Sequence, residues 1–313
     1  MFLAPANALL RSDRPLGALR SMGDVETLLD EGSALGARDL TDFTWKQLLD
    51  FDSCTNCGRC QDQCPAWASG KPLSPRKIIQ DLRSYAAVRG PIIFEAQKNG
   101  EPVPEPEPLA VDWVSREAAW SCTTCRACME ACPVFIEHID SIVDMRRYMT
   151  MEENDVPETA MTALQNIEQR GHPWRGTPFS RTDWTQDLEV PIVAELENPQ
   201  DIEILFWVGC TGALEVRSQA IPKSLVSVFK AAGVKYAILG TEETCTGDPA
   251  RRMGNEFLFQ TLAQQNIETL NSYNIQKIVT ICPHCFNSIK NEYPQLEGNY
   301  EVLHYTEFVN ELI

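Results

Sequence analysis

The sequence predicts an α+β protein in which a helical N-terminal half precedes an α/β domain with a small parallel sheet. Up to residue 171 the apolar residues follow helical spacing and strand patterns are almost absent. After residue 201, four apolar runs rich in β-branched residues alternate with helical segments, as in a parallel sheet covered on both faces. Between these halves, residues 172–200 are rich in Pro, Gly and polar residues. The sequence therefore predicts an N-terminal arm, a helical domain, a linker and an α/β domain, at residues 1–40, 41–171, 172–200 and 201–313.

Local signals place the helices of the N-terminal half. Residues 41–52 predict a short helix with Thr41 or Asp42 as its N-cap. Ser74 followed by Pro75 is a favoured start for the next helix, and the prolines of 99–108 predict an extended loop. Two more helices follow, one after residue 138 with Ile139, Ile142, Val143 and Met149 on one side, and one at 157–170 closed by Gly171.

The C-terminal half alternates strands and helices. Strands are expected at 202–208, 234–239, 277–281 and 300–304. The longer intervening helices are expected at 215–232, 249–272 and 306–312, with Gly233 ending the first of them.

The charge of the chain restricts its partners. With 27 basic and 44 acidic side chains the formal net charge is −17, which argues against nucleic acid and against an anionic membrane surface as binding partners. No stretch approaches the roughly 20 apolar residues of a membrane span, and the N-terminus lacks the pattern of a secretory signal. The 12 cysteines are therefore expected in the reducing cytoplasm, as metal ligands or redox groups.

Eight of the cysteines form two identical runs. Cys54, Cys57, Cys60 and Cys64 have the spacing C-x2-C-x2-C-x3-C followed by Pro, and Cys122, Cys125, Cys128 and Cys132 repeat it. This is the bacterial ferredoxin run, in which the fourth cysteine binds the other of two clusters. The spacing predicts two 4Fe–4S clusters, one held by Cys54, Cys57, Cys60 and Cys132 and the other by Cys122, Cys125, Cys128 and Cys64. The alternative is structural zinc, which C-x2-C pairs also bind.

The remaining four cysteines follow predicted strands. Cys210 comes just after the first strand, Cys245 follows the second, and Cys282 and Cys285 follow the third. The carboxyl ends of parallel strands lie at one edge of a sheet, where ligands usually bind, so we expect these four cysteines to converge. Buried free cysteines and a redox dithiol at C-P-H-C are the alternatives.

Both cysteine regions resemble known iron–sulfur families. The 57 residues between Cys64 and Cys122, with the segment CPAWASGKPLSPRKIIQDLR, look like the helical ferredoxin module of succinate dehydrogenase iron–sulfur subunits and, above all, heterodisulfide reductases. The spacing from Cys210 to Cys285 resembles the cysteine-rich CCG domain of heterodisulfide reductase, glycolate oxidase and anaerobic glycerol-3-phosphate dehydrogenase iron–sulfur subunits. The second cysteine of the CCG motif is Thr246 here, and a hard hydroxyl cannot replace a bridging thiolate. We therefore expect either an ordinary third 4Fe–4S cluster on Cys210, Cys245, Cys282 and Cys285, or no cluster.

Three further residues are candidates for a place beside that site. Arg251 and Arg252 begin a helix close to Cys245 in sequence, where they could offset the negative charge of a cluster. His284 lies between Cys282 and Cys285 and could donate a hydrogen bond or carry a proton. No dinucleotide fingerprint, P-loop or catalytic triad is present, so no catalytic residue is assigned.

The order of the two modules resembles that of heterodisulfide reductase D-type subunits over residues 41–313. The segment FLAPANALLRSDRPLGAL looks like the stretch that follows the membrane module in fused members of this family, so the chain is expected to be one piece of a larger protein. The resemblance implies an electron-transfer subunit of an oxidoreductase complex. Its partners would be a flavoprotein such as electron-transferring flavoprotein, or a dehydrogenase, and a quinone or thiol/disulfide acceptor.

Two other functions remain open at this point. The chain could act like a heterodisulfide reductase at the C-terminal cysteines, or it could be a zinc scaffold without redox activity. The expected location is cytoplasmic, with contact to the inner face of a membrane only through a quinone or haem subunit.

Overall fold

The computed structural model describes residues 3–174 and 178–313 and divides the chain into two compact units. The first unit runs to Pro157 and includes Arg252–Asn255, and the second comprises Glu158–Arg251 and Glu256–Ile313. This division falls earlier than the predicted linker at 172–200, of which residues 175–177 lie outside the described part of the chain. One reason is that the backbone N–H of Cys245 donates to the carbonyl of Gly171 at 2.7 Å, which ties the end of the preceding helix to the second unit.

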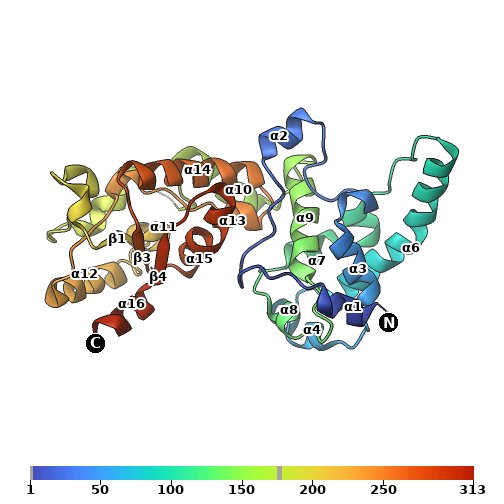
Figure 1. The fold of residues 1–313 in the computed structure, drawn as a ribbon, viewed down its shortest axis with the longest axis horizontal. Coiled ribbons are helices and arrows are strands. Elements are labelled where there is room, and N and C mark those ends of the chain that lie inside the picture. The colour runs from blue at the N-terminus through green and yellow to red at the C-terminus, as the bar shows by residue number, and fades with distance from the viewer. Residues whose placement is uncertain (1–2, 175–177) are drawn as a thin grey trace. The chain divides into compact units, whose positions relative to one another are not determined.

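The first unit is helical, as the sequence predicts (Figure 1). Its core is formed mainly by α3, α6 and α9, with Phe51, Ile79, Leu82 and Met145 fully buried. The α-helices of this unit are α1 (Ala4–Leu9), α2 (Val25–Asp30), α3 (Trp45–Ser53), α4 (Arg59–Asp62), α5 (Pro65–Ala68), α6 (Pro75–Asn99), α7 (Arg116–Trp120), α8 (Ala127–Glu130) and α9 (His138–Met151).

Capping residues set the starts of the long helices. The prediction that Thr41 or Asp42 caps α3 is wrong, because Thr44 accepts from the N–H of Gln47 in a reciprocal capping box. Asp42 instead closes the capping box of a separate 3-10 helix, Leu40–Asp42. The predicted start of α6 is confirmed, since the Ser74 hydroxyl accepts from the N–H of Lys77 at 3.1 Å.

The second unit is an α/β domain with a four-stranded parallel sheet in the order β2-β1-β3-β4. Its strands are β1 (Ile204–Trp207), β2 (Tyr236–Ala237), β3 (Lys277–Thr280) and β4 (Glu301–His304). Its helices are α10 (Glu158–Arg170), α11 (Gly209–Leu214), α12 (Ala220–Ala232), α13 (Asp248–Arg252), α14 (Glu256–Ser272), α15 (Pro283–Asn287) and α16 (Tyr305–Leu312). Each of the four predicted strands is present, and all of the pairings are parallel.

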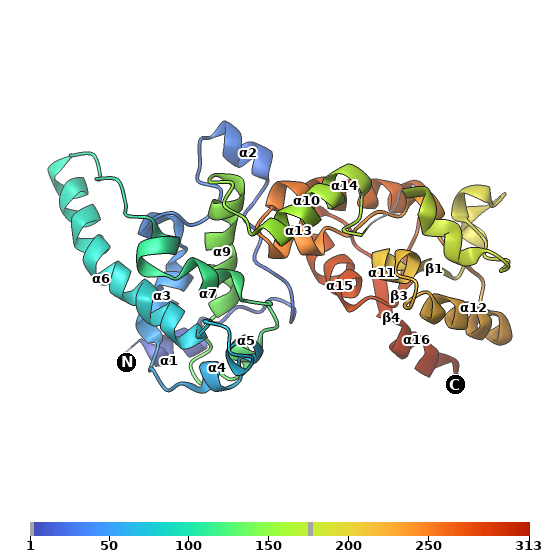
Figure 2. The same cartoon turned by 180° about the vertical axis from the view of Figure 1, so that it is seen from behind.

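Helices cover both faces of this sheet. In Figures 1 and 2, α12 and α16 lie on one face and α14 lies on the other. Phe206 of β1 packs edge to face on Phe229 of α12, which in turn contacts Phe308 of α16. Gly233 ends α12 in the left-handed conformation at φ 71°, as predicted. The predicted helix at 215–232 begins later than expected, at Ala220, and a separate helix that was not predicted from the sequence, α11, precedes it and carries Cys210.

Among the described residues, no helix is long and apolar enough to cross a membrane.

Candidate metal centres

The two ferredoxin-type runs fold into the same backbone shape. In each run the residue before the second cysteine is left-handed, with φ 58° at Asn56 and 54° at Thr124. The residue after the second cysteine is also left-handed, with φ 87° at Gly58 and 68° at Arg126, and it opens the single-turn helix α4 or α8. Such turns direct backbone N–H groups toward one point and thereby create an anion-binding concavity.

Backbone N–H groups donate hydrogen bonds directly to two of the cysteine sulfurs. The N–H of Thr124 lies 3.4 Å from Cys122 Sγ, and the N–H of Ile136 lies 3.4 Å from Cys132 Sγ. Hydrogen bonds of this kind stabilise thiolate charge and tune the potential of a bound cluster.

The first cysteine group includes a cysteine from the second run. The charges of Cys54, Cys57 and Cys132 all act on Cys60, and together with burial they raise the pKa of Cys60 to about 12. One cavity is lined by Cys54, Cys57, Cys60 and Cys132 together. The structure therefore brings together the four cysteines that the sequence assigns to the first cluster.

The second group has the reciprocal composition. Burial and the charges of neighbouring cysteines, Cys64 among them, raise the pKa of Cys128. The pKa of Cys122 is also raised by burial, and both Cys125 and Cys64 act on it. Cys64 thus lies close enough to Cys122 and Cys128 to act on both, and its assignment to the second cluster stays a prediction.

These groups suit a 4Fe–4S cluster chemically. Burial raises the pKa of Cys60, Cys122, Cys128 and Cys132, so these thiols resist ionisation unless a positively charged core binds them as thiolates.

Arg146 of α9 supports the second group, although no sequence motif identifies it. Its guanidinium donates to the carbonyl of Ala119 at 3.0 and 2.7 Å and to the carbonyl of Cys122 at 2.6 Å. It also lies 5.2 Å over the ring of Trp120. Arg146 therefore binds the carbonyls at the end of α7 and fixes the chain where the second run begins.

The four C-terminal cysteines lie at the carboxyl ends of β1, β2 and β3. Cys210 is in α11 after β1, Cys245 follows β2, and Cys282 and Cys285 lie where β3 leads into α15. The charges of Cys282, Cys210 and Cys245 all act on Cys285. The edge of the sheet thus gathers all four, as the strand pattern predicts.

A buried arginine serves this C-terminal group. Arg181 lies in the 3-10 helix Pro178–Thr185 and donates to Cys210 Sγ at 3.0 Å and to Glu243 Oε1 at 2.9 Å. Glu243 also accepts from the N–H groups of Val208 and Gly209, at 2.9 and 2.8 Å. These bonds hold the turn between β1 and α11 and place a positive charge against Cys210.

Two of the four thiols differ from their neighbours. A hydrogen bond from Cys245, together with Arg181, lowers the pKa of Cys210 to about 6. A hydrogen bond from Cys285 lowers the pKa of Cys282 to about 7, and backbone N–H groups of α15 contribute. Cys210 and Cys282 are partly exposed, whereas Cys245 and Cys285 are buried.

The other predicted neighbours of this site have different surroundings. Thr246 is buried, with its hydroxyl 3.8 Å from Cys285 Sγ. The side chain of His284 is 71% exposed and its Nδ1 lies 2.8 Å from Asp248. Arg251 pairs with Glu256 and Glu292 and lies 4.3 Å over the ring of Phe259. Arg252 belongs to the first unit, where its guanidinium donates to the carbonyl of Gly17 at 3.1 Å.

Comparison with known families covers both cysteine regions. Residues 53–136 match the 4Fe-4S dicluster domain, and residues 204–290 match the cysteine-rich CCG domain. An EtfAB:quinone oxidoreductase of Syntrophomonas wolfei is 41% identical over 91% of this chain and 42% of its own length. A probable membrane-anchored ferredoxin of Chromohalobacter salexigens is 42% identical over 96% of this chain and 47% of its own length.

Another relative is a dihydromethanophenazine:CoB–CoM heterodisulfide reductase subunit of Methanosarcina barkeri, which is 29% identical over 88% of this chain and 66% of its own length. No solved structure matches the chain significantly. The chain spans about half the length of the two relatives with more than 40% identity.

Proposed function

Because the chain belongs to the iron–sulfur oxidoreductases that join a 4Fe-4S dicluster domain to a cysteine-rich CCG domain, we propose that it is the electron-transfer part of an oxidoreductase complex. Electrons pass through two 4Fe–4S clusters between a redox partner and a quinone or thiol/disulfide acceptor. The crossed arrangement of the two cysteine groups is the observation that supports this most strongly.

We assign Cys54, Cys57, Cys60 and Cys132 to one cluster and Cys122, Cys125, Cys128 and Cys64 to the other. Each bound cluster would accept and release one electron, and the chain would supply the thiolates, the hydrogen bonds and the burial. The N–H groups of Thr124 and Ile136 would favour the more negative, reduced state by donating to ligand sulfurs. Arg146 would hold the loop of Cys122 in the same position in both redox states.

We infer the redox partners of this chain from the names of its relatives. The relative named EtfAB:quinone oxidoreductase supports electron-transferring flavoprotein as the donor and a quinone as the acceptor. The relative named a probable membrane-anchored ferredoxin supports a location at a membrane, where a quinone or haem subunit would be the partner of this chain. The net charge of −17 favours a partner whose docking surface is basic.

Anaerobic purification, iron and sulfide analysis, and electron paramagnetic resonance of the reduced protein test this function. Two clusters correspond to about eight irons and eight sulfides per chain. A colourless protein with stoichiometric zinc would contradict the proposal and would establish the zinc scaffold instead. Reduced flavoprotein should then reduce the clusters, and a quinone should reoxidise them.

The C-terminal site fits a third 4Fe–4S cluster on Cys210, Cys245, Cys282 and Cys285. Four converging sulfurs, with one of them already bonded to a buried guanidinium, support this assignment. Such a cluster would raise the iron content to about twelve per chain. Cys282→Ala would then remove about four irons, whereas iron that stays unchanged in this variant would mean that the site binds no cluster.

Thiol–disulfide chemistry at the same site is a second candidate function. Two observations support it. Cys210 and Cys282 are partly exposed and have lowered pKa values, and each is hydrogen-bonded to a buried cysteine, Cys245 or Cys285. Reduction of a substrate disulfide would take two electrons and two protons, with the electrons delivered by the two clusters of the first unit. Reoxidation of the reduced protein by a disulfide, lost in Cys210→Ala, supports this function. Failure of every disulfide tested would rule it out.

A further inference from the structure

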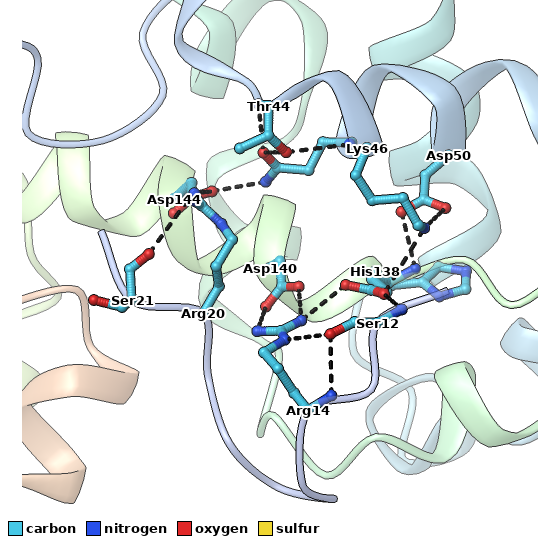
Figure 3. A network of polar contacts seen from close by, with 12 residues as sticks. Ser12, Arg14, Arg20, Ser21, Thr44, Lys46, Asp50, His138, Asp140 and Asp144 are labelled. Carbon is cyan, nitrogen blue, oxygen red and sulfur yellow. Dashed lines mark hydrogen bonds and ion pairs between the residues drawn. The ribbon is translucent and has the colours of Figure 1, made fainter. Parts of the chain in front are cut away.

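The segment of residues 12–20, here called the strap, is bound along helix α9. Arg14 donates to Glu137 at 2.8 Å and pairs with both oxygens of Asp140. Arg20 donates to Asp144 at 2.6 Å. Figure 3 shows these two arginines reaching from the strap to Asp140 and Asp144 of α9. The strap is thus held by ion pairs on both sides of residues 15–19.

The carboxylates that bind the strap are themselves buried. Asp140 is 5% exposed and Asp144 is 3% exposed. Asp144 also accepts from Gln47 at 2.7 Å and from Arg147 at 2.7 Å, and Arg147 donates to the carbonyl of Arg20 at 3.1 Å. Buried charges of this kind are tolerated only when they are paired, so the strap and α9 depend on each other.

A row of apolar side chains on α9, next to Asp140 and Asp144, packs with two of the cysteines. Ile139 and Val143 are one helical turn apart, directly beside the turn-spaced Asp140 and Asp144. They form a small apolar cluster with Leu19 of the strap and with Cys60 and Cys128. Leu19 is 3% exposed. The strap therefore makes ion pairs with Asp140 and Asp144 of α9 and also packs Leu19 with Ile139 and Val143 of the same helix.

Cys60 and Cys128 are the two cysteines at which the groups approach each other. Each is the third cysteine of its run, and the charge of Cys60 acts on Cys128. Their single-turn helices α4 and α8 are in contact. Leu19 belongs to the apolar cluster that contains both of these cysteines.

We propose that the strap is an insulating element for electron transfer, in which Arg14 and Arg20 position Leu19 so that it excludes water from the space between the two clusters. This inference rests on the proposed function. Leu19 acts as a shielding residue, and the proposed ligands of the clusters are cysteines alone.

The physical consequence is a change of potential. A reduced cluster carries one more negative charge than an oxidised one, and water stabilises that charge better than an apolar side chain does. Shielding by Leu19 therefore lowers the potential of a cluster that lies next to it. It also slows attack by water and oxygen on the sulfurs of Cys60 and Cys128.

The test uses the anaerobically purified full chain and the series Leu19→Met, Leu19→Val and Leu19→Ala. Leu16 of the same strap is 72% exposed, so Leu16→Ala is the matched control. The midpoint potential of each cluster is measured by a redox titration followed by electron paramagnetic resonance. Loss of visible absorption in air gives the rate of oxidative damage, and thermal unfolding checks that each variant is folded.

Leu19→Ala should shift the potential of at least one cluster upward. A tenfold change in the ratio of reduced to oxidised cluster corresponds to about 59 mV for one electron. Damage in air should be several-fold faster, Leu19→Val should lie between wild type and Leu19→Ala, and Leu19→Met and Leu16→Ala should behave like wild type. A folded Leu19→Val or Leu19→Ala with unchanged potentials and unchanged damage rate would overturn the proposal.

Equal shifts in Leu16→Ala and Leu19→Ala would also overturn it, because the effect would then be general to the strap. These outcomes differ from failure of the proposed function, in which the wild-type chain itself would contain no iron–sulfur clusters.

Discussion

Replacement of Cys64 by alanine separates the crossed ligand sets from a simpler arrangement in which each run binds its own cluster. Cys64 follows Cys60 by four residues, yet its charge acts on Cys122 and Cys128 of the other run. Under the crossed arrangement, Cys64→Ala removes one of the four ligands of the cluster held by Cys122, Cys125 and Cys128. The cluster held by Cys54, Cys57, Cys60 and Cys132 keeps its full set.

The expected size of the effect is the loss of one whole cluster, or about four irons per chain. The substitution removes one small buried sulfur, and a change of that size costs about 1 kcal/mol of unfolding free energy, which the fold should survive. Because both cysteines would serve one cluster, Cys64→Ala combined with Cys128→Ala should lose no more iron than either single variant.

Reference variants make the assay specific. Cys60→Ala and Cys128→Ala each remove an uncrossed ligand, so their electron paramagnetic resonance spectra identify the cluster that remains in each case. The spectrum of Cys64→Ala should match that of Cys128→Ala, and the spectrum of Cys132→Ala should match that of Cys60→Ala. A match of Cys64→Ala to Cys60→Ala would refute the reasoning, because each run would then bind its own cluster.

Three further substitutions test the contacts that support the sites. Burial would raise the pKa of Asp144, but Arg147 and Arg20 hold it below the usual value of 3.8. Asp144→Asn should therefore cost about 3 kcal/mol in urea unfolding at pH 7, and this difference from wild type should shrink as the pH falls below 3.8 through the lowered pKa of Asp144. Gly36→Ala should destabilise the first unit by at least 2 kcal/mol more than Gly32→Ala, because both residues have positive φ but only at Gly36 would a Cβ lie 2.6 Å from the carbonyl oxygen of Asp144. Equal unfolding free energies of the two variants in calorimetry would contradict this. Arg181→Gln should destabilise the second unit by about 3 kcal/mol because Glu243 stays buried without its partner, and Glu243→Gln in the same chain should recover part of that loss in urea unfolding.

The features of the fold that the sequence predicts correctly depend on residues that lie close together in the chain. Repeated cysteine spacing fixes the local backbone, since the two runs share left-handed residues at matching positions, and the four apolar runs become the four parallel strands. Ser74 caps α6 as expected because its signal lies within one turn of the helix. The prediction of Thr41 or Asp42 as the cap of α3 missed Thr44, because two capping boxes, Asp39 with Asp42 and Thr44 with Gln47, follow each other closely in the chain.

The residues that sequence reasoning missed act through long-range contacts. Arg181 lies in the segment predicted as a linker, and its partners Cys210 and Glu243 are 29 and 62 residues away. Arg14 and Arg20 lie in the predicted arm, and their partners on α9 are more than 120 residues away. No periodicity or motif links such pairs, so only the folded chain shows that these arginines are structural.

The arginines Arg14, Arg20 and Arg181 share one physical task near the two sets of cysteines. The chain carries a large negative charge, and proposed clusters with their thiolates would add more in places where little water can compensate. Arg181 meets this charge at Cys210 directly, whereas Arg14 and Arg20 neutralise Asp140 and Asp144, which neighbour Ile139 and Val143 of the apolar cluster around Cys60 and Cys128. Thr246 also lowers the negative charge of its site, because it places a neutral hydroxyl where the family motif has another thiolate. The environment of each site therefore reduces the local negative charge, which is the condition for a site that must accept a further electron.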